Sequence, residues 1–530
     1  MITNLARTYH HTTAFRPLTT YGRQLVFYLF TFLHFYLFTF SPLYLFTACT
    51  PTRDTATVID KLPPIYPDYT DVTIPVNIAP MNFLVRGDNV KAVEAVATCG
   101  DDQLTVRQRG ASVTFDLDDW KDFLGKAAGK TVSLQVYSCD ASDKWTEWKT
   151  FSWQVANDSI DPWLSYRLIE PDYEVWSNVA IEQRCVENFE TTSLSDYQHA
   201  GDKCMNCHVY DNSPRKEAQE KHFQRSMLYV RGEGGGAFLS EDGHLRKLNI
   251  KTPDMVSGSV YYGFSPTGRY ITFSTNVIIP AFHSDAAKRL EVYDTKSDVY
   301  CADLRENRII RSPLVSDSTQ LETFPTFSPD GQWVYFCTAP LDSLRRGGIK
   351  SLHYSLCRIA FDSQKGTFGT QIDTLFRGTS LTATADGGSV CHPRISPDGR
   401  HILFTVQDYG TFPIWHREAD LRMMDLQTGK VDSLSVVNSD KSDTYHSWSS
   451  NSRWFVFASK RDDGLYGKPY FCYVDRQGRA HKPFVLPQRD PTKYDNTLKS
   501  YNAPELGQHP AAFSASDVAG AMRKEAEPFK

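Results

Sequence analysis

The chain has 530 residues, of which 41% are hydrophobic and 13% aromatic, so it is long enough for two or three domains with sizeable cores. Its formal net charge is −5, and charges of both signs are mixed along the chain. No basic patch or run of Lys and Arg is present, which argues against a nucleic-acid-binding protein. We therefore expect no nucleic acid among its partners.

The N-terminus has the pattern of an export signal over residues 1–48. Its first 24 positions hold three arginines and no acidic residue, and an almost uncharged apolar run extends from Leu25 to Ala48. The run is long enough to span a membrane, so an uncleaved anchor is the alternative. Pro42 and the junction before Cys49 favour cleavage. In both cases the body of the protein is expected outside the cytoplasm.

The apolar run ends in Leu45-Phe-Thr-Ala-Cys49. This resembles the lipobox of bacterial lipoproteins, although Phe46 departs from the usual small or branched residue. The resemblance implies that Cys49 is lipidated and becomes the mature N-terminus, anchoring the protein to a membrane of the bacterial cell envelope and facing the periplasm. Which membrane this is stays open. Residues 49–67 are rich in Pro, Thr and Asp, and are expected to form a tether.

Residues 68–160 alternate apolar and polar side chains between turn signals. Six or more short strands in about 90 residues are typical of an immunoglobulin-like sandwich, here with a short helix over Asp119–Ala127. Cys99 and Cys139 either bridge or remain two buried thiols. No catalytic constellation is visible, so we expect a packing or docking module.

The sequence Cys204-Met-Asn-Cys207-His208 has the C-x-x-C-H pattern of c-type haem attachment. Two cysteine thiols one helical turn apart bind the haem, and the histidine offers its imidazole to the iron. Half of a zinc site, a thioredoxin-like pair and an unmodified structural pair are the alternatives. No second Cys-x-x-Cys and no βαβ pattern supports the first two. The expected cofactor is one covalent haem c.

The residues around this motif, 161–225, are expected to form a short helical haem segment. Apolar residues recur with a period near 3.6 from Val175 to Phe189, which predicts a helix. The segment is too short to bury a haem alone, and soluble proteins seldom leave such an apolar patch exposed. We therefore expect it to pack on the following domain, with Cys204, Cys207 and His208 facing that domain.

A repeat occupies residues 226–505. Each unit is a strand, a Ser-Pro-Asp-Gly-like turn and a second strand, and the anchoring serines are Ser265, Ser328, Ser396 and Ser449. Further strands follow each pair, and four strands per unit at this period predict propeller blades. The motif is strong at Ser328 and Ser396 and degenerate where Asn451-Ser452 replaces Asp-Gly.

These repeats resemble TolB-like β-propellers of periplasmic proteins. The chain as a whole resembles envelope lipoproteins that join one c-type haem motif to such a propeller. The resemblance implies a protein-binding platform with no catalytic residues to carry over. Four clear units and one closed by a strand near residues 496–505 predict five blades, with six as the alternative. Residues 506–530 are expected to be a C-terminal tail.

The iron needs a sixth ligand or remains open. The candidates in the propeller are His283, His416 and His446, with His222 and Met227 as further possibilities. The expected function is that of a monohaem c-type cytochrome, passing electrons to a docked protein partner. One alternative is a non-redox TolB-like scaffold, and another is a haem enzyme with an open sixth site. An electron carrier or a binding protein is favoured over an enzyme.

Overall fold

The computed structural model describes residues 53, 55–170, 178–201, 203–205, 207–212, 223–282, 290–381 and 387–530. The chain divides into two units, Met1–Asp54 and Thr55–Lys530. The expected export signal and Cys49 lie outside the described residues. Within the described ranges, no helix is both long and apolar enough to cross a membrane.

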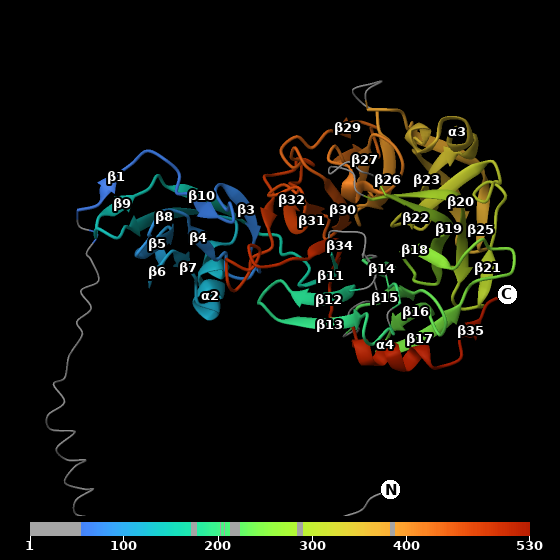
Figure 1. Ribbon diagram of the computed structural model, residues 1–530, viewed down its shortest axis with the longest axis horizontal. Coiled ribbons are helices and arrows are strands. Elements are labelled where there is room, and N and C mark those ends of the chain that lie inside the picture. Colours follow the sequence, from blue (N-terminus) through green and yellow to red (C-terminus); the bar gives the residue numbers. More distant parts are fainter. Residues whose placement is uncertain are drawn as a thin grey trace, which may run out of the picture. The chain divides into compact units, whose positions relative to one another are not determined.

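The second unit begins with two β-sheets and one helix (Figure 1). In the larger sheet, β8 pairs with β5 on one side and with β9 and β10 on the other, while β1 and β3 add in parallel at its edges. Its strands are β1 (Thr57–Val58), β3 (Val72–Pro75), β5 (Ala92–Cys99), β6 (Asp102–Arg109), β8 (Thr131–Cys139), β9 (Trp145–Glu147) and β10 (Phe151–Ala156). The smaller sheet holds β2 (Ile65–Tyr66), β4 (Phe83–Val85) and β7 (Ser112–Val113).

The helix α2 (Leu117–Ala127) confirms the helix expected there. The carboxylate of Asp116 accepts hydrogen bonds from the backbone N–H groups of Asp118 and Asp119, which caps the first turn. The expected tether over residues 49–67 is too long, because two strands already lie within it. Strand β1 pairs with β9, and β2 pairs with β4.

Cys99 and Cys139 are separate buried thiols. Cys139 pairs with Ala92 across β5 and β8, whereas Cys99 lies seven positions further along β5. At about 3.3 Å per residue, the two cysteines are roughly 23 Å apart. A disulfide needs Cα atoms within about 7 Å, so the bridging alternative is wrong.

From Trp163 onward the chain forms six sheets, each built on four antiparallel strands (Figure 1). The first contains β11 (Trp163–Ile169), β12 (Ala180–Cys185), β13 (Thr191–Asp196) and the late strand β34 (Ser500–Gly507). The second contains β14 (Cys207–Tyr210), β15 (Ser226–Val230), β16 (Gly236–Glu241) and β17 (His244–Asn249), with β35 (Glu527–Pro528) added in parallel. The third contains β18 (Ser259–Phe264), β19 (Tyr270–Phe282), β20 (Leu290–Asp303) and β21 (Arg308–Ile310).

The remaining three sheets follow the same order. The fourth contains β22 (Gln320–Phe327), β23 (Trp333–Pro340), β24 (Ser355–Asp362) and β25 (Thr367–Phe376). The fifth contains β26 (Ser389–Ile395), β27 (His401–Gln407), β28 (Asp420–Asp425) and β29 (Val431–Asp432). The sixth contains β30 (Asp443–Trp448), β31 (Trp454–Ser459), β32 (Lys468–Tyr473) and β33 (Phe484–Val485). The short helices are α3 (Leu341–Gly347), η2 (Ile349–Ser351), η3 (Pro413–Trp415) and α4 (Ala515–Met522).

One edge strand from each sheet belongs to a ring. These inner strands contact one another in the order β14, β18, β22, β26, β30 and β34, and β34 contacts β14 again. Because β34 also pairs with β11, the end of the chain joins the first sheet to the last. This radial repetition of small sheets is the β-propeller architecture.

Three sequence expectations are wrong in this region. A helix was expected over Val175–Phe189, but from residue 180 the chain forms strand β12. In this strand Ile181 and Gln183 are buried at alternate positions. Residues 161–225 are not a separate helical segment, because β11–β14 belong to the ring of sheets. Residues 506–530 are not a free tail, because α4 and β35 pack on the second sheet.

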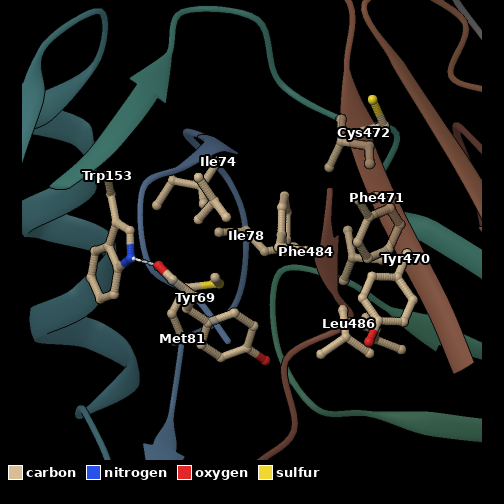
Figure 2. Close-up of a cluster of buried hydrophobic side chains, with 14 of the residues drawn as sticks. Tyr69, Ile74, Ile78, Met81, Trp153, Tyr470, Phe471, Cys472, Phe484 and Leu486 are labelled. Carbon is tan, nitrogen blue, oxygen red and sulfur yellow. Dashed lines mark hydrogen bonds between the residues drawn. The ribbon is translucent and has the colours of Figure 1, made fainter. Parts of the chain in front are cut away.

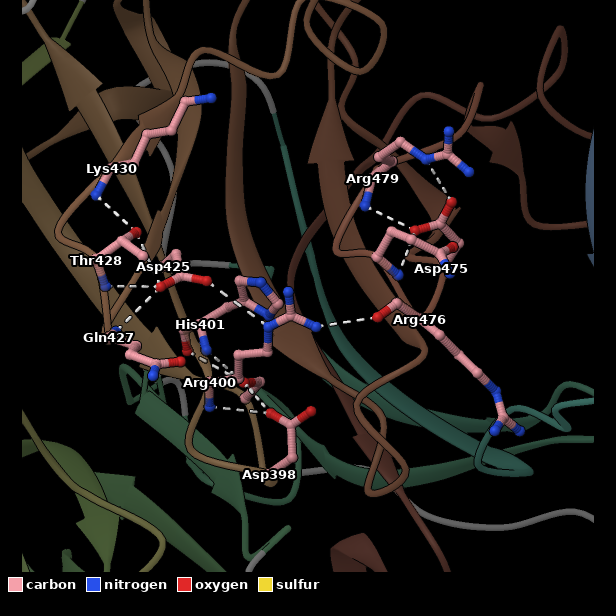
Figure 3. Close-up of polar contacts among 12 residues, drawn as sticks. Asp398, Arg400, His401, Asp425, Gln427, Thr428, Lys430, Asp475, Arg476 and Arg479 are labelled. Carbon is pink, nitrogen blue, oxygen red and sulfur yellow. Dashed lines mark hydrogen bonds and ion pairs between the residues drawn. The ribbon is translucent and has the colours of Figure 1, made fainter.

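The Ser-Pro-Asp-Gly turns are held by their own side chains. In the fifth sheet, the hydroxyl of Ser396 donates to Asp398 (2.6 Å) and accepts from the backbone N–H of His401 (2.9 Å). Asp398 in turn accepts from the backbone N–H of Arg400 (3.1 Å), whose guanidinium donates to the carbonyl of Arg476 in the next sheet (Figure 3). The motif therefore shapes the turn and links neighbouring sheets.

The N-terminal sheets and the sixth sheet share one hydrophobic core. Figure 2 shows Trp153, Ile74 and Ile78 on one side and Phe471 and Phe484 on the other. A hydrogen bond from a side chain to the backbone reinforces the contact, since the indole N–H of Trp454 donates to the carbonyl of Asp158 (2.9 Å). The two parts are thus joined by packing as well as by the chain.

Candidate functional site

The inner strands turn one equivalent residue each toward the centre of the ring. In five strands this residue has a left-handed backbone, with φ between 43° and 53°, and lies at an irregularity of strand pairing. These residues are Tyr261, Phe324, His392, Tyr445 and Ala503. When the repeats are aligned, β14 has Cys207 at this position. All six residues line one central cavity.

The central cavity is partly open, and the space between its lining atoms, open solvent included, is about 840 Å³. Besides the six ring residues, it is lined by His208, His446, Arg167, Arg394 and Glu505. A neighbouring cavity of about 980 Å³, counted in the same way, is bordered by Cys204. Cys207 and Tyr261 line both, so the two cysteines and the histidine of the motif face two adjoining cavities.

His208 is an imidazole without a polar partner. Within the described part of the chain, neither Nδ1 nor Nε2 has a hydrogen-bond partner, although both atoms are buried. Burial, together with the charges of Arg167 and Arg394, lowers the pKa of His208 to about 3. The side chain keeps some accessible surface because that surface faces the cavity. His208 is therefore neutral at pH 7, with a nitrogen lone pair available to a ligand.

The two cysteines are thiols on a strand and its approach, not on a helical turn as expected. Cys207 opens β14 and pairs with Tyr229, and the carbonyl of Cys204 accepts from the backbone N–H of Arg231 (2.8 Å). Burial and the neighbouring Cys204 raise the pKa of Cys207 to about 12. The helical geometry expected for the motif is therefore wrong, and Cys207 belongs to an inner strand of the propeller and not to a separate segment packed on it.

The histidines considered as sixth ligands lie in different surroundings. His283 and His222 fall outside the described residues, and Met227 is buried in β15. His416 follows η3, and its two ring nitrogens lie 2.7 Å from Glu418 and 3.0 Å from Glu291. Burial is the largest single effect and lowers the pKa of His416, but the hydrogen bonds and charges of the two carboxylates together outweigh it. The pKa of His416 is therefore raised above its usual value. With both nitrogens occupied, His416 has no lone pair to offer.

His446 and His392 both line the central cavity. Nε2 of His446 lies 2.9 Å from the carbonyl oxygen of Leu403, which holds the ring against β27. His392 was not among the candidates from sequence. Its ring contacts Phe324 (4.1 Å between centroids) and Tyr445 (4.6 Å). An alignment of the repeats on their anchoring serines would have shown that His392, directly before Pro393, is equivalent to Tyr261, Phe324 and Tyr445.

Two guanidinium groups give the cavity its charge. Arg167 comes from β11 and Arg394 from β26, and Arg394 donates to Glu505 (2.8 Å). Burial raises the pKa of Glu505 to about 7 despite this ion pair. The charge near His208 is thus positive, which favours an anionic ligand.

Within the described ranges, no three His, Cys, Asp or Glu side chains gather as a metal site. This differs from what a bare ion such as zinc needs, namely about four protein ligands. A haem iron needs one or two, because the macrocycle supplies the other four.

Away from the cavity, Asp294 in β20 is a buried carboxyl whose only nearby stabilising donor is Asn276 (2.9 Å) among the described side chains. Burial raises the pKa of Asp294 to about 7, so the folded state holds a proton that the unfolded chain releases near pH 4. Its contribution to stability is complete below that pH and is lost as pH rises through 7.

Replacing this residue, D294N, is therefore expected to stabilise the protein increasingly between about pH 4 and pH 7, and the gain should stay constant above that. Each unit of pKa shift corresponds to about 1.4 kcal/mol, so the gain at pH 8 is far larger than the error of an unfolding measurement. Urea unfolding at a series of pH values measures it. The control D317N removes an exposed carboxyl whose pKa is lowered by Thr319, and it should leave this pH range unchanged. Equal pH slopes for D294N and the wild type would contradict the prediction.

No protein-family profile matches the chain, and a search of curated proteins finds no match. Among solved structures, an oligogalacturonate lyase from Vibrio parahaemolyticus is 10% identical, over 74% of this chain and 100% of its own, with a TM-score of 0.33. The β-propeller domain of the Trilobed protease from Pyrococcus furiosus is 10% identical, over 67% and 82%, with a TM-score of 0.27. Prolyl oligopeptidase B from Galerina marginata is 10% identical, over 58% and 41%, with a TM-score of 0.33. At this level the likeness carries nothing about activity, and the ring of inner strands itself shows a mainly β protein with a β-propeller.

Proposed function

We propose that this protein is an envelope-anchored monohaem c-type cytochrome that passes electrons to a protein partner. Cys204 and Cys207 hold one haem c, and His208 binds its iron. The observation that carries the proposal is the position of the motif. Its second cysteine stands at the inner-strand position that faces the central cavity, and the following imidazole has no other polar partner among the described residues.

The residues present fit the group in three respects. Each thiol adds across one vinyl C=C of the haem: a carbon–sulfur bond forms, the thiol hydrogen moves to the other vinyl carbon, and no oxidant is needed. A bond from neutral His208 to the iron would give the imidazole a partner and so remove the cost of burying it unpaired. Arg167 and Arg394 supply positive charge for the two haem carboxylates.

The bound haem supplies a one-electron redox centre, and the protein sets its potential through axial ligation and burial. The aromatic side chains Tyr261, Phe324 and Tyr445 give apolar walls to the cavity that His208 faces. A low dielectric around the iron would favour its less charged, reduced state. The two arginines would act in the same direction, because their positive charge opposes the added positive charge of the oxidised iron.

The remaining parts of the proposal concern attachment and docking. Cys49 carries the lipid, so the protein lies on a bacterial envelope membrane and faces the periplasm. The six sheets form six blades, and the two N-terminal sheets form an immunoglobulin-like sandwich that docks the partner together with the propeller. The shared core of Figure 2 supports a sandwich held rigidly against the sixth blade.

The test is production of the full chain in a bacterium that carries haem-attachment machinery. A denaturing gel stained for haem, and a mass increase of one haem, are expected. Unstained protein with the mass of the bare polypeptide would overturn the cytochrome and favour a non-redox TolB-like scaffold. Rapid binding of carbon monoxide by the reduced wild type would favour a haem enzyme with an open sixth site.

A further inference from the structure

We propose that His392 is the second axial ligand of the haem iron. This rests on the proposed function, and it adds a residue that the repeat motif itself does not reveal. The position of the residue in the ring of inner strands carries the proposal.

The strand β26, which holds His392, lies diametrically opposite the haem motif. Six inner strands follow one another around the ring, and β26 is the third from β14 in either direction. His392 and Cys207 line the same central cavity from opposite inner strands. A haem held by Cys207 and His208 in this cavity would have β26 across the ring from it.

The backbone turns His392 inward. Its φ of 53° is left-handed, as at the equivalent residues of four other strands, so this conformation belongs to the fold. What is particular to β26 is the side chain. The other four strands place Tyr, Phe, Tyr and Ala there, and among the four residue types that these five strands hold at this position only histidine is a common iron ligand.

One ring nitrogen of His392, Nδ1, has no polar partner among the described residues. This nitrogen is buried, and the ring is packed among Phe324, Tyr445 and Tyr261. A buried unpaired polar group is costly, whereas a bond to iron satisfies it.

His446 is the competitor in the same cavity. It belongs to β30, which is two strands from β14, and its Nε2 lies 2.9 Å from the carbonyl oxygen of Leu403. Its Nδ1, like that of His392, is buried with no hydrogen-bond partner among the described residues, so the place of each strand in the ring is what separates the two histidines. We therefore assign the ligand to His392 and keep His446 as the matched control.

The experiment compares H392A, H392M and H446A with the wild-type holoprotein. Covalent haem content is measured first by gel stain and mass, so that failure to attach haem is separated from failure to ligate it. The wild type and H446A are expected to show a six-coordinate low-spin iron by electron paramagnetic resonance. H392A should become high-spin, bind carbon monoxide when reduced, and return to low spin when imidazole is added.

H392M keeps a side chain of similar volume, so it should fold even if the smaller alanine of H392A disturbs the cavity. A thioether in place of imidazole raises the reduction potential, as in His/Met-ligated cytochromes. Fully loaded H392A with an unchanged low-spin spectrum would overturn the assignment while leaving the cytochrome proposal intact. A spin change confined to H446A would move the ligand to His446. A wild type without haem would overturn both proposals.

Discussion

Replacing Cys204 and Cys207 together with alanine is expected to abolish covalent haem completely. Each thiol forms one carbon–sulfur bond, so the double variant has no link that survives denaturation. The single variant C204A should keep haem through Cys207, with its α band at longer wavelength because one vinyl group stays conjugated. Haem-stained denaturing gels and the pyridine haemochrome spectrum measure both effects.

The matched control for these variants is C185A. Cys185 ends β12 in the first sheet, is a buried thiol, and does not line either cavity. Its haem content should equal that of the wild type. A haem stain that persists in the double variant would show that attachment does not use this motif.

Replacing Trp454 with alanine is expected to cost about 3–5 kcal/mol of the free energy of unfolding. The indole is fully buried between the sixth sheet and the N-terminal part, and its N–H donates to the carbonyl of Asp158. The variant therefore loses apolar burial and leaves the partly buried carbonyl of Asp158 without this donor. Urea unfolding followed by circular dichroism measures the change.

The repeat offers its own control for this prediction. Trp333 opens β23 at the position that Trp454 holds in β31, but it is only partly buried and lies under the guanidinium of Arg358, 4.0 Å from the ring centre. W333A should lose clearly less stability than W454A. Equal losses would indicate that the N-terminal part does not stabilise the sixth sheet.

Much of the propeller is predictable because its turns are local. Ser396 and Asp398 bond to groups within five residues, so their pattern is legible in the sequence and the strands on either side follow. The same holds for α2, whose capping residue Asp116 and buried Trp120 are close neighbours. Local chemistry of this kind repeats, and the repeats indicate the fold.

The first sheet was missed because its partners are remote. Gln183 is buried in β12 and accepts a hydrogen bond from the backbone N–H of Ala511, and Arg184 donates to Gln488. Polar residues at such positions disturb the period-two pattern, which leaves a helical spacing over Val175–Phe189. Partners some 300 residues away are invisible to a reading of periodicity.

The candidate site divides in the same way. Cys204, Cys207 and His208 stand in five consecutive positions, so their spacing is a local signal. His392 joins them only because six strands close into a ring, and its histidine replaces an aromatic residue of the repeat. Its importance therefore follows from the topology, and the sequence shows it only after the repeats are aligned.

The closure of the ring by β34 has a consequence for the order of assembly. Ser500–Gly507 supplies the strand beside β14, so the inner strand that holds Cys207 gains its last neighbour only when almost the whole chain is present. Under the proposed function, attachment of a haem would need reachable thiols. The late arrival of β34 would then leave a time interval in which the motif is accessible, and it would end that interval by completing the ring.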